Sequence, residues 1–131
     1  MRIVVDTNAF VAAAFNPGSA SARILAAARD GRLALVWDGA TRAETRHVLS
    51  RIPRIRWEDA EPLFCEANRF AQETEPEAFG LVEDPADRTF AALAAAADAV
   101  LITSDHHLLD HADTLPCRVE TPGAFARRCA F

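Results

Sequence analysis

Four acidic side chains stand where a folded chain could bring them together. Asp6 and Asp105 each lie at the end of a short apolar run rich in β-branched residues, Asp87 lies in the first turn of a predicted helix, and Glu44 lies near the start of another. Carboxylate oxygens drawn from four separate elements are the hard ligands that Mg²⁺ and Mn²⁺ prefer. The pattern is therefore consistent with a divalent-cation site.

Buried strands must position two of these acids. Residues 3–5, 33–37 and 99–103 are short and apolar throughout, as in strands of a parallel sheet that is covered on both faces, and residues 117–119 resemble a fourth strand. Helices are expected between them, at residues 9–15, 39–52, 57–72, 85–97, 106–109 and 122–128. A further helix, capped by Ser19 or Ser21, is expected to reach Arg29. Residues 79–82 are read as a short strand or an extended segment. The fold class is therefore α/β with a central parallel sheet, in a single domain over residues 1–131.

The carboxyl ends of parallel strands meet at one edge of the sheet, where ligands of such folds bind. The same acids also have a purely structural interpretation. Asp38, Asp84 and Asp105 occupy helix N-cap positions, Asp87 fits the third position of a capping box, and Glu44 by itself is typical of a solvated helix. Spacing alone leaves the metal site and the capping interpretation both open.

The amino-acid composition excludes some kinds of active site. The chain has 14 basic residues, all of them Arg, against 19 acidic ones, and its formal net charge is -5. The absence of Lys excludes a P-loop lysine and a Schiff-base lysine. The three Cys residues have no C-x-x-C spacing, which argues against a disulfide framework and a thiolate zinc site. With no membrane span or signal peptide in the sequence, we expect a cytoplasmic protein.

Several motifs together resemble the PIN-domain nucleases. They are V-V-D-T-N-A-F at the start, Glu44 after the second strand, D-P-A-D-R-T-F-A-A-L-A, and L-I-T-S-D-H-H-L-L near the end. The likeness is closest to the bacterial branch of toxin components in toxin–antitoxin pairs, related to VapC. It implies a three-layer α/β/α sandwich, a cognate antitoxin as partner, and cleavage of RNA by a metal-activated water.

Matching motif to motif, the resemblance places the family's acidic residues on Asp6, Glu44, Asp87 and Asp105, as catalytic and metal-binding groups. Asn8 and Thr103 match polar positions that line the same pocket. Arg88 stands where many relatives carry a further acid, and Ser104 stands where Gly is usual. The number of bound ions therefore stays open.

Arginines cluster locally in this acidic chain. Arg42 and Arg46 lie four residues apart on the helix that carries Glu44, and we interpret them as candidate RNA phosphate ligands; a solvated helix face is an equally good interpretation. His107 and His111 have the spacing of two zinc ligands, but they lie in a short polar segment with no Cys nearby, which disfavours zinc.

The sequence thus predicts a metal-dependent endoribonuclease. The main alternative is a catalytically inactive PIN-like module that binds RNA or protein. A metal-dependent phosphatase or phosphate receiver fits poorly, because that class relies on a lysine. We also expect a homodimer, since the family commonly pairs and Phe64 and Phe70 on the helix predicted at 57–72 exceed what a thin domain must bury.

Overall fold

A four-stranded parallel sheet forms the centre of the computed structural model, which describes residues 1–131. Its strands are β1 (Arg2–Val5), β2 (Ala34–Leu35), β3 (Val100–Ile102) and β4 (Val119–Glu120), in the order β2-β1-β3-β4. β1 pairs in parallel with β2 on one side and with β3 on the other. The chain therefore leaves β1 in one direction and returns on its far side, so the strand order reverses between β1 and β3. In open α/β sheets this switch point is where ligands bind, beyond the carboxyl ends of the strands.

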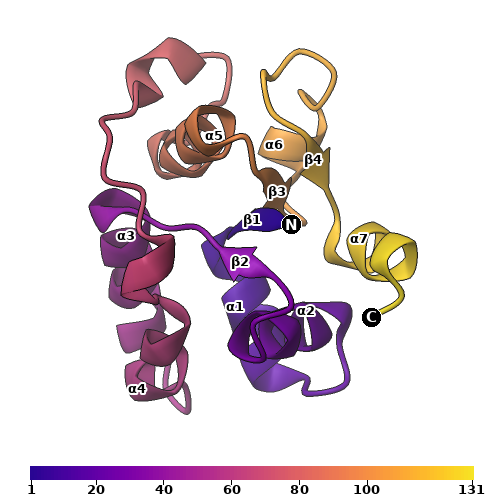
Figure 1. Ribbon diagram of the computed structural model, residues 1–131. Helices are drawn as coiled ribbons and strands as arrows, with labels where there is room; N and C mark the ends of the chain where they lie inside the picture. Colours follow the sequence, from indigo (N-terminus) through magenta and orange to yellow (C-terminus); the bar gives the residue numbers. More distant parts are fainter.

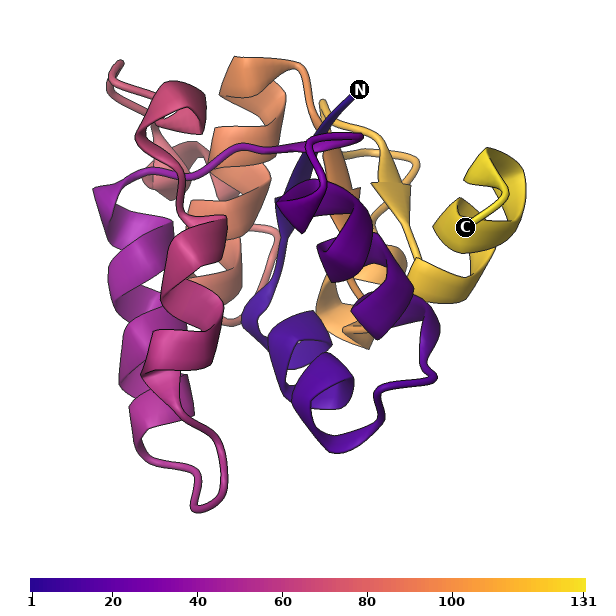
Figure 2. The same cartoon turned by 60° about the horizontal axis from the view of Figure 1, so that its bottom comes forward.

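Helices cover both faces of the sheet, which confirms the predicted sandwich (Figure 1). α1 (Thr7–Phe15), α2 (Ala20–Arg29) and α7 (Pro122–Cys129) cover one face, whereas α5 (Pro85–Ala97) and α6 (His106–Leu109) cover the other. α3 (Gly39–Ser50) and the short α4 (Trp57–Ala60) run side by side beyond the β2 edge (Figure 2). No helix has the length and apolar character needed to cross a membrane.

Local capping signals fix where the helices begin. Ser19 caps α2, and Asp84 caps α5 with Pro85 in its first turn. At α3, the Asp38 carboxylate accepts from the Thr41 backbone N–H at 2.9 Å, and the Thr41 hydroxyl accepts from the Asp38 N–H at 3.1 Å. Each cap satisfies helix N–H groups that have no intrahelical partner, so these starts agree with the sequence.

The single helix predicted at residues 57–72 is wrong. The segment forms α4, then two 3₁₀ turns, η1 (Glu61–Leu63) and η2 (Glu66–Asn68). Pro62 explains the break, because proline has no N–H to bond the carbonyl four residues earlier and its ring clashes with that carbonyl. The apolar spacing that predicted a helix correctly indicates that these side chains are buried, but the backbone that carries them is not one continuous helix.

Phe64 shows what the apolar residues of this segment do instead. Its ring stacks on Phe10, with ring centroids 5.7 Å apart, and meets Trp37 edge-on at 5.9 Å and Trp57 at 5.4 Å. Phe70 packs against the core on the α5 face. Phe64 and Phe70 both pack inside a single copy of the chain, so they no longer support a dimer.

Three smaller expectations also need correction. The strand predicted at 33–37 is short, because at Trp37 the chain pairs instead with the segment that carries Asn68 and Phe70: Trp37 N–H donates to Asn68 O at 3.3 Å, and Phe70 N–H donates to Trp37 O at 2.7 Å. Residues 79–82 form the end of a 3₁₀ helix, η3 (Pro76–Phe79), and a turn. The last strand begins at Val119, two residues later than predicted.

Candidate active site

A pocket of about 190 Å³ lies at the carboxyl ends of β1 and β3. Ten residues line it, seven from the helices α1, α3 and α5 and three from helix N-cap positions: Asp6, Thr7, Asn8, Glu44, Val48, Asp84, Ala86, Asp87, Phe90 and Asp105. All four acids singled out in the sequence are among them. Asp84 is a fifth acid, which the sequence identified only as a helix cap.

Asp6 is the most buried of these acids, with 3% of its surface exposed. It caps α1, where one carboxylate oxygen accepts from the Ala9 N–H at 3.0 Å and the other accepts from the Thr103 hydroxyl. Burial raises its pKa to about 6, while those two hydrogen bonds oppose the rise and the Asp105 charge adds to it. The strand end therefore holds a rigid carboxylate whose charge is poorly compensated.

Thr103 connects the two strand-end acids. Its hydroxyl donates to Asp6 and accepts from the backbone N–H of Asp105 at 2.9 Å. The Asp105 carboxylate caps α6 by accepting from the His107 N–H at 2.8 Å. Asp105 thus acts as a cap and also lines the pocket, so a capping role does not exclude it from the site.

Asp87 comes from the first turn of α5. Its Oδ2 is buried and has no hydrogen-bond partner. Burial raises the pKa of Asp87 to about 7, and the neighbouring carboxyl of Asp105, followed by the charges of Asp84 and Asp6, raises it further. An orphaned buried carboxylate oxygen next to like charges is costly, and a bound cation would relieve that cost.

Glu44 reaches the pocket from α3, on the same face as Val48. A buried contact between the hydroxyls of Thr7 and Thr45, 3.3 Å apart, ties α3 to α1. That contact fixes the rotation of α3 that turns Glu44 toward the acids. This pair was not predicted from the sequence, although a Thr on each of two apolar helix faces is a visible signal.

The donor set suits a hard divalent cation. Five of the ten lining residues carry carboxylates, and one buried oxygen lacks any partner. No three His, Cys, Asp or Glu side chains converge closely enough to form a ready-made metal site. The pocket therefore fits such an ion in chemistry, and binding would require the half-buried carboxylates to turn inward.

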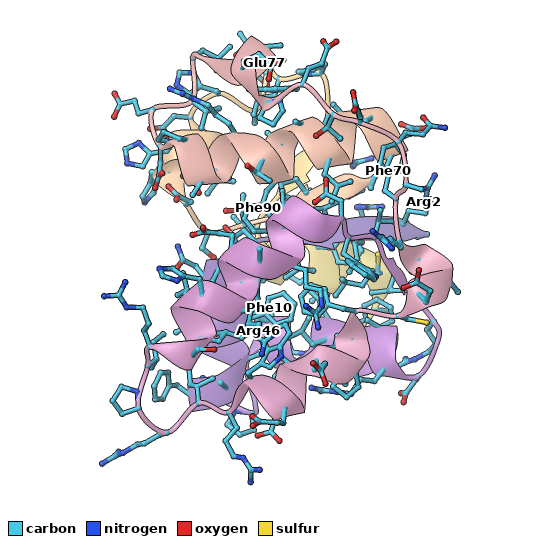
Figure 3. The ribbon with its side chains drawn as sticks, turned by 90° about the vertical axis from the view of Figure 1, so that its left-hand side faces the viewer. Arg2, Phe10, Arg46, Phe70, Glu77 and Phe90 are labelled. Carbon is cyan, nitrogen blue, oxygen red and sulfur yellow. The ribbon has the colours of Figure 1, made fainter.

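Arg42 and Arg46 do not join this pocket. A two-residue offset on an α-helix turns a side chain by about 200°, so both lie opposite Glu44. Their guanidinium carbons lie 5.2 and 5.7 Å from the ring centroid of Trp57, and Figure 3 shows Arg46 between α3 and the segment that carries α4. Arg42 also pairs with Glu61 at 3.2 Å. Arg42 and Arg46 therefore lie outside the acidic pocket, and their contact with RNA phosphates stays a prediction.

Arg88 and the histidines have local roles. Arg88 donates through Nε to the Val82 carbonyl at 2.6 Å and through Nη2 to the Glu83 carbonyl at 3.3 Å, which holds the segment before α5. His107 Nδ1 lies 3.5 Å from Glu83 Oε2. The side chain of Arg88 is thus engaged outside the acidic pocket.

Comparison with known proteins identifies the family of this site. A family model described as the PIN domain matches residues 2–107. The chain belongs to the PIN-domain family. PIN domains are generally nucleases, and all the residues that line the acidic pocket lie within the matched range.

A solved structure shares the fold. The chain is similar to one in "Structure of FitAB bound to IR36 DNA fragment", with a TM-score of 0.58 and 19% identity over 92% of this chain and 94% of that chain. No curated protein sequence matches the chain significantly. The family therefore rests on the sequence match, and the solved structure shows that the same fold occurs in another protein.

Proposed function

We propose that this PIN-domain protein is an endoribonuclease that uses Mg²⁺ or Mn²⁺ and acts as the toxin of a toxin–antitoxin pair. One observation carries the proposal. Asp6, Glu44, Asp87 and Asp105 come from four separate elements and line one pocket at the switch point of the sheet. Acids brought together from such distant parts of the chain have no common structural task that capping explains.

Some of these residues would hold the cation, and others orient the ligands or the RNA. Asp6 and Asp105 would bind the cation directly, Asp87 would share it or bind a second one, and Glu44 would hold an outer water or that second ion. A divalent ion held there would lower the pKa of a bound water and neutralise charge on the scissile phosphate. Thr103 keeps the Asp6 carboxylate aimed by its hydrogen bond, and exposed Asn8 can donate an amide hydrogen bond to the RNA at the rim.

The partners follow from the same assignment. The fold neighbour was solved as FitAB bound to a DNA fragment. By analogy, we propose that a DNA-binding antitoxin restrains this chain in the cytoplasm. A homodimer stays a prediction from the family resemblance alone, since Phe64 and Phe70 are used inside the fold.

A second candidate is a PIN domain that binds RNA or protein without cutting. One observation favours it: no three potential ligands stand ready to hold a metal ion. The orphaned oxygen of Asp87 weighs against it, because a binding module has no need for a buried unpaired carboxylate.

Cleavage of single-stranded RNA with Mn²⁺, Mg²⁺ or EDTA tests the proposal. We expect metal-dependent cutting by the wild type and none by Asp6→Asn or Asp105→Asn, with circular dichroism confirming that both variants fold. Asp113→Asn removes one charge at an exposed position outside the pocket and should cut normally. Wild-type rates in either strand-end variant would reject the assignment.

A further inference from the structure

A second hollow lies on the opposite side of α3 from the acidic pocket. This basic groove has a volume of about 880 Å³ and is formed by α3 and the segment around η2. Arg42, Arg46, Arg51 and Arg69 line it, and Glu66 is its one carboxylate. A groove with four arginines and one acid is a strong local reversal of charge in a chain with a net charge of -5.

Aromatic rings lie under three of the four guanidinium groups of this groove, those of Arg42, Arg46 and Arg69. The guanidinium carbons of Arg42 and Arg46 lie 5.2 and 5.7 Å from a Trp57 ring centroid, and that of Arg69 lies 5.7 Å from a Trp37 ring centroid. A guanidinium over a ring keeps its N–H groups at the edge, where they can donate to an anion. Because the side chains are already ordered, binding an anion costs less conformational entropy.

Two of these arginines have no carboxylate partner. Neither Arg46 nor Arg51 forms a salt bridge, and Arg51 Nη1 donates only to the His47 ring Nε2 at 3.3 Å. Arg42 and Arg69, in contrast, pair with Glu61 and with Glu66. The unpaired charges of Arg46 and Arg51 therefore remain available to a polyanion.

The acidic pocket lacks the means to attract such a polyanion. Five of its ten lining residues are acidic and none is basic. RNA phosphates approaching these carboxylates are repelled, so a substrate needs a cationic surface elsewhere on the protein. The basic groove supplies that surface on the same helix.

A continuous path joins the two sites over α3. Glu44 faces the pocket, and the exposed surface of α3 next to it carries Ala40 and then Gly39, Ala43 and His47, which already line the groove. Three of these four are Gly or Ala, so the N-terminal half of α3 forms a low ridge. An extended single strand can cross a helix that is about 10 Å wide and touch both sides.

We propose that the basic groove binds the sugar–phosphate backbone of the RNA strand whose scissile bond enters the acidic pocket. This inference rests on the proposed function, since it names how that site holds its substrate. The groove selects phosphates and leaves the bases unread, because Trp37 is buried and its indole N–H already donates to the Cys65 carbonyl at 2.7 Å.

Binding without cleavage tests the inference. In EDTA, fluorescence anisotropy of a labelled single-stranded RNA of about a dozen nucleotides measures affinity against salt. The double variant Arg46→Gln/Arg51→Gln should bind about tenfold more weakly, because two charge-assisted contacts are lost. Its slope of log affinity against log salt should be shallower by about 1.4, two phosphates at about 0.7 each.

Matched variants separate the groove from general charge. Arg2→Gln/Arg127→Gln removes the same charge from exposed positions outside the groove and should keep wild-type affinity and slope. Ser50 lines the groove and is exposed, so Ser50→Arg should tighten binding and Ser50→Glu should weaken it. This pair keeps the inference testable where the double arginine variant fails to fold.

Four outcomes would overturn the inference. The first two are an unchanged RNA affinity in the groove variants and an equal loss of affinity in the two double variants. The third is tighter binding of a poly-glutamate peptide of equal charge than of RNA. The fourth is a rise in KM for a dinucleotide that is as large as the rise for the longer RNA. With Mn²⁺, the groove variants should raise KM for the longer RNA and leave kcat near the wild-type value. A wild type that binds RNA through the groove and never cuts it would reject the proposed function while retaining the groove as an RNA site.

Discussion

Replacing Asp87 with Asn should stabilise the metal-free protein at pH 8. The pKa of Asp87 is about 7 in the folded chain, against 3.8 for an ordinary Asp. The folded state therefore holds this proton more tightly than the unfolded state, and stability falls as the pH rises from about 4 through about 7. Asn at this position has no charge to lose, so the variant escapes that penalty.

The magnitude follows from the shift and from the exposure of the side chain. One pKa unit corresponds to about 1.4 kcal/mol, so a shift of about three units is worth roughly 4 kcal/mol before solvent screening. Asp87 is only half-buried, and screening reduces the penalty to about 1–2 kcal/mol. Losing an acid from the first turn of α5 costs about 0.3–1 kcal/mol in the opposite direction. We expect a net gain of about 1 kcal/mol, or about 3–6 °C in Tm.

Thermal melts of the wild type and Asp87→Asn measure this difference at pH 8 and near pH 4, with EDTA and with excess Mn²⁺. The stability gain in EDTA should shrink toward pH 4, where the wild-type carboxyl is protonated and therefore as uncharged as the Asn side chain. Mn²⁺ at about 100 times its Kd should stabilise the wild type by about 2.7 kcal/mol, and the variant by less. Asp113→Asn, which is exposed and outside the pocket, should change neither the melt nor the Mn²⁺ response.

One result would refute the reasoning. Suppose that Asp87→Asn melts below the wild type at pH 8 in EDTA, and that Mn²⁺ shifts neither protein. Asp87 would then act only through the dipole of α5, and the pocket would be a set of helix caps. The orphaned Asp87 Oδ2 would have to find a partner in water.

Two further predictions concern the support of the site and the fold. Thr103→Val should lower the free energy of unfolding by about 1–3 kcal/mol in urea titrations. The loss should be larger at pH 8 than at pH 4, because the Thr103 hydroxyl stabilises the charged form of Asp6. An equal loss for the exposed Thr114→Val would contradict this. Phe64→Ala should cost about 2–4 kcal/mol and leave the mass in light scattering unchanged, whereas exposed Phe15→Ala should cost little; a change of mass with unchanged stability would place Phe64 in an interface instead.

Local signals in the sequence predicted most of the fold. The caps at Ser19, Asp38 and Asp84 set three helix starts, and short apolar runs located β1 and β3. These predictions succeeded because each depends on a few adjacent residues and on hydrogen bonds that the backbone must make. The convergence of acids at the strand ends followed from the parallel sheet.

Residues 57–72 show where such signals fail. Trp57 and Phe64 recur at spacings that suit a helix, yet they are buried because Phe10 and Trp37 come from distant parts of the chain to meet them. Periodicity reports that a side chain is covered, and it cannot tell what covers it. Pro62 was the local signal against a helix, and its missing N–H outweighs the apolar pattern.

α3 makes the same point for the site itself. Thr45 and Leu49 face the core, Glu44 and Val48 face the acidic pocket, and Arg46 faces the basic groove. The two-residue offset between Glu44 and Arg46 was visible in the sequence and already placed them on opposite sides of any helix. The sequence did not predict that Trp57, at the start of α4, lies against α3 with a ring centroid 5.7 Å from the Arg46 guanidinium carbon. α3 presents one carboxylate on one side and guanidinium groups on the other, so it can face a cation and a phosphate chain without bringing these opposite charges together. An Arg inside the pocket would instead pair with the acids and occupy the place of the metal.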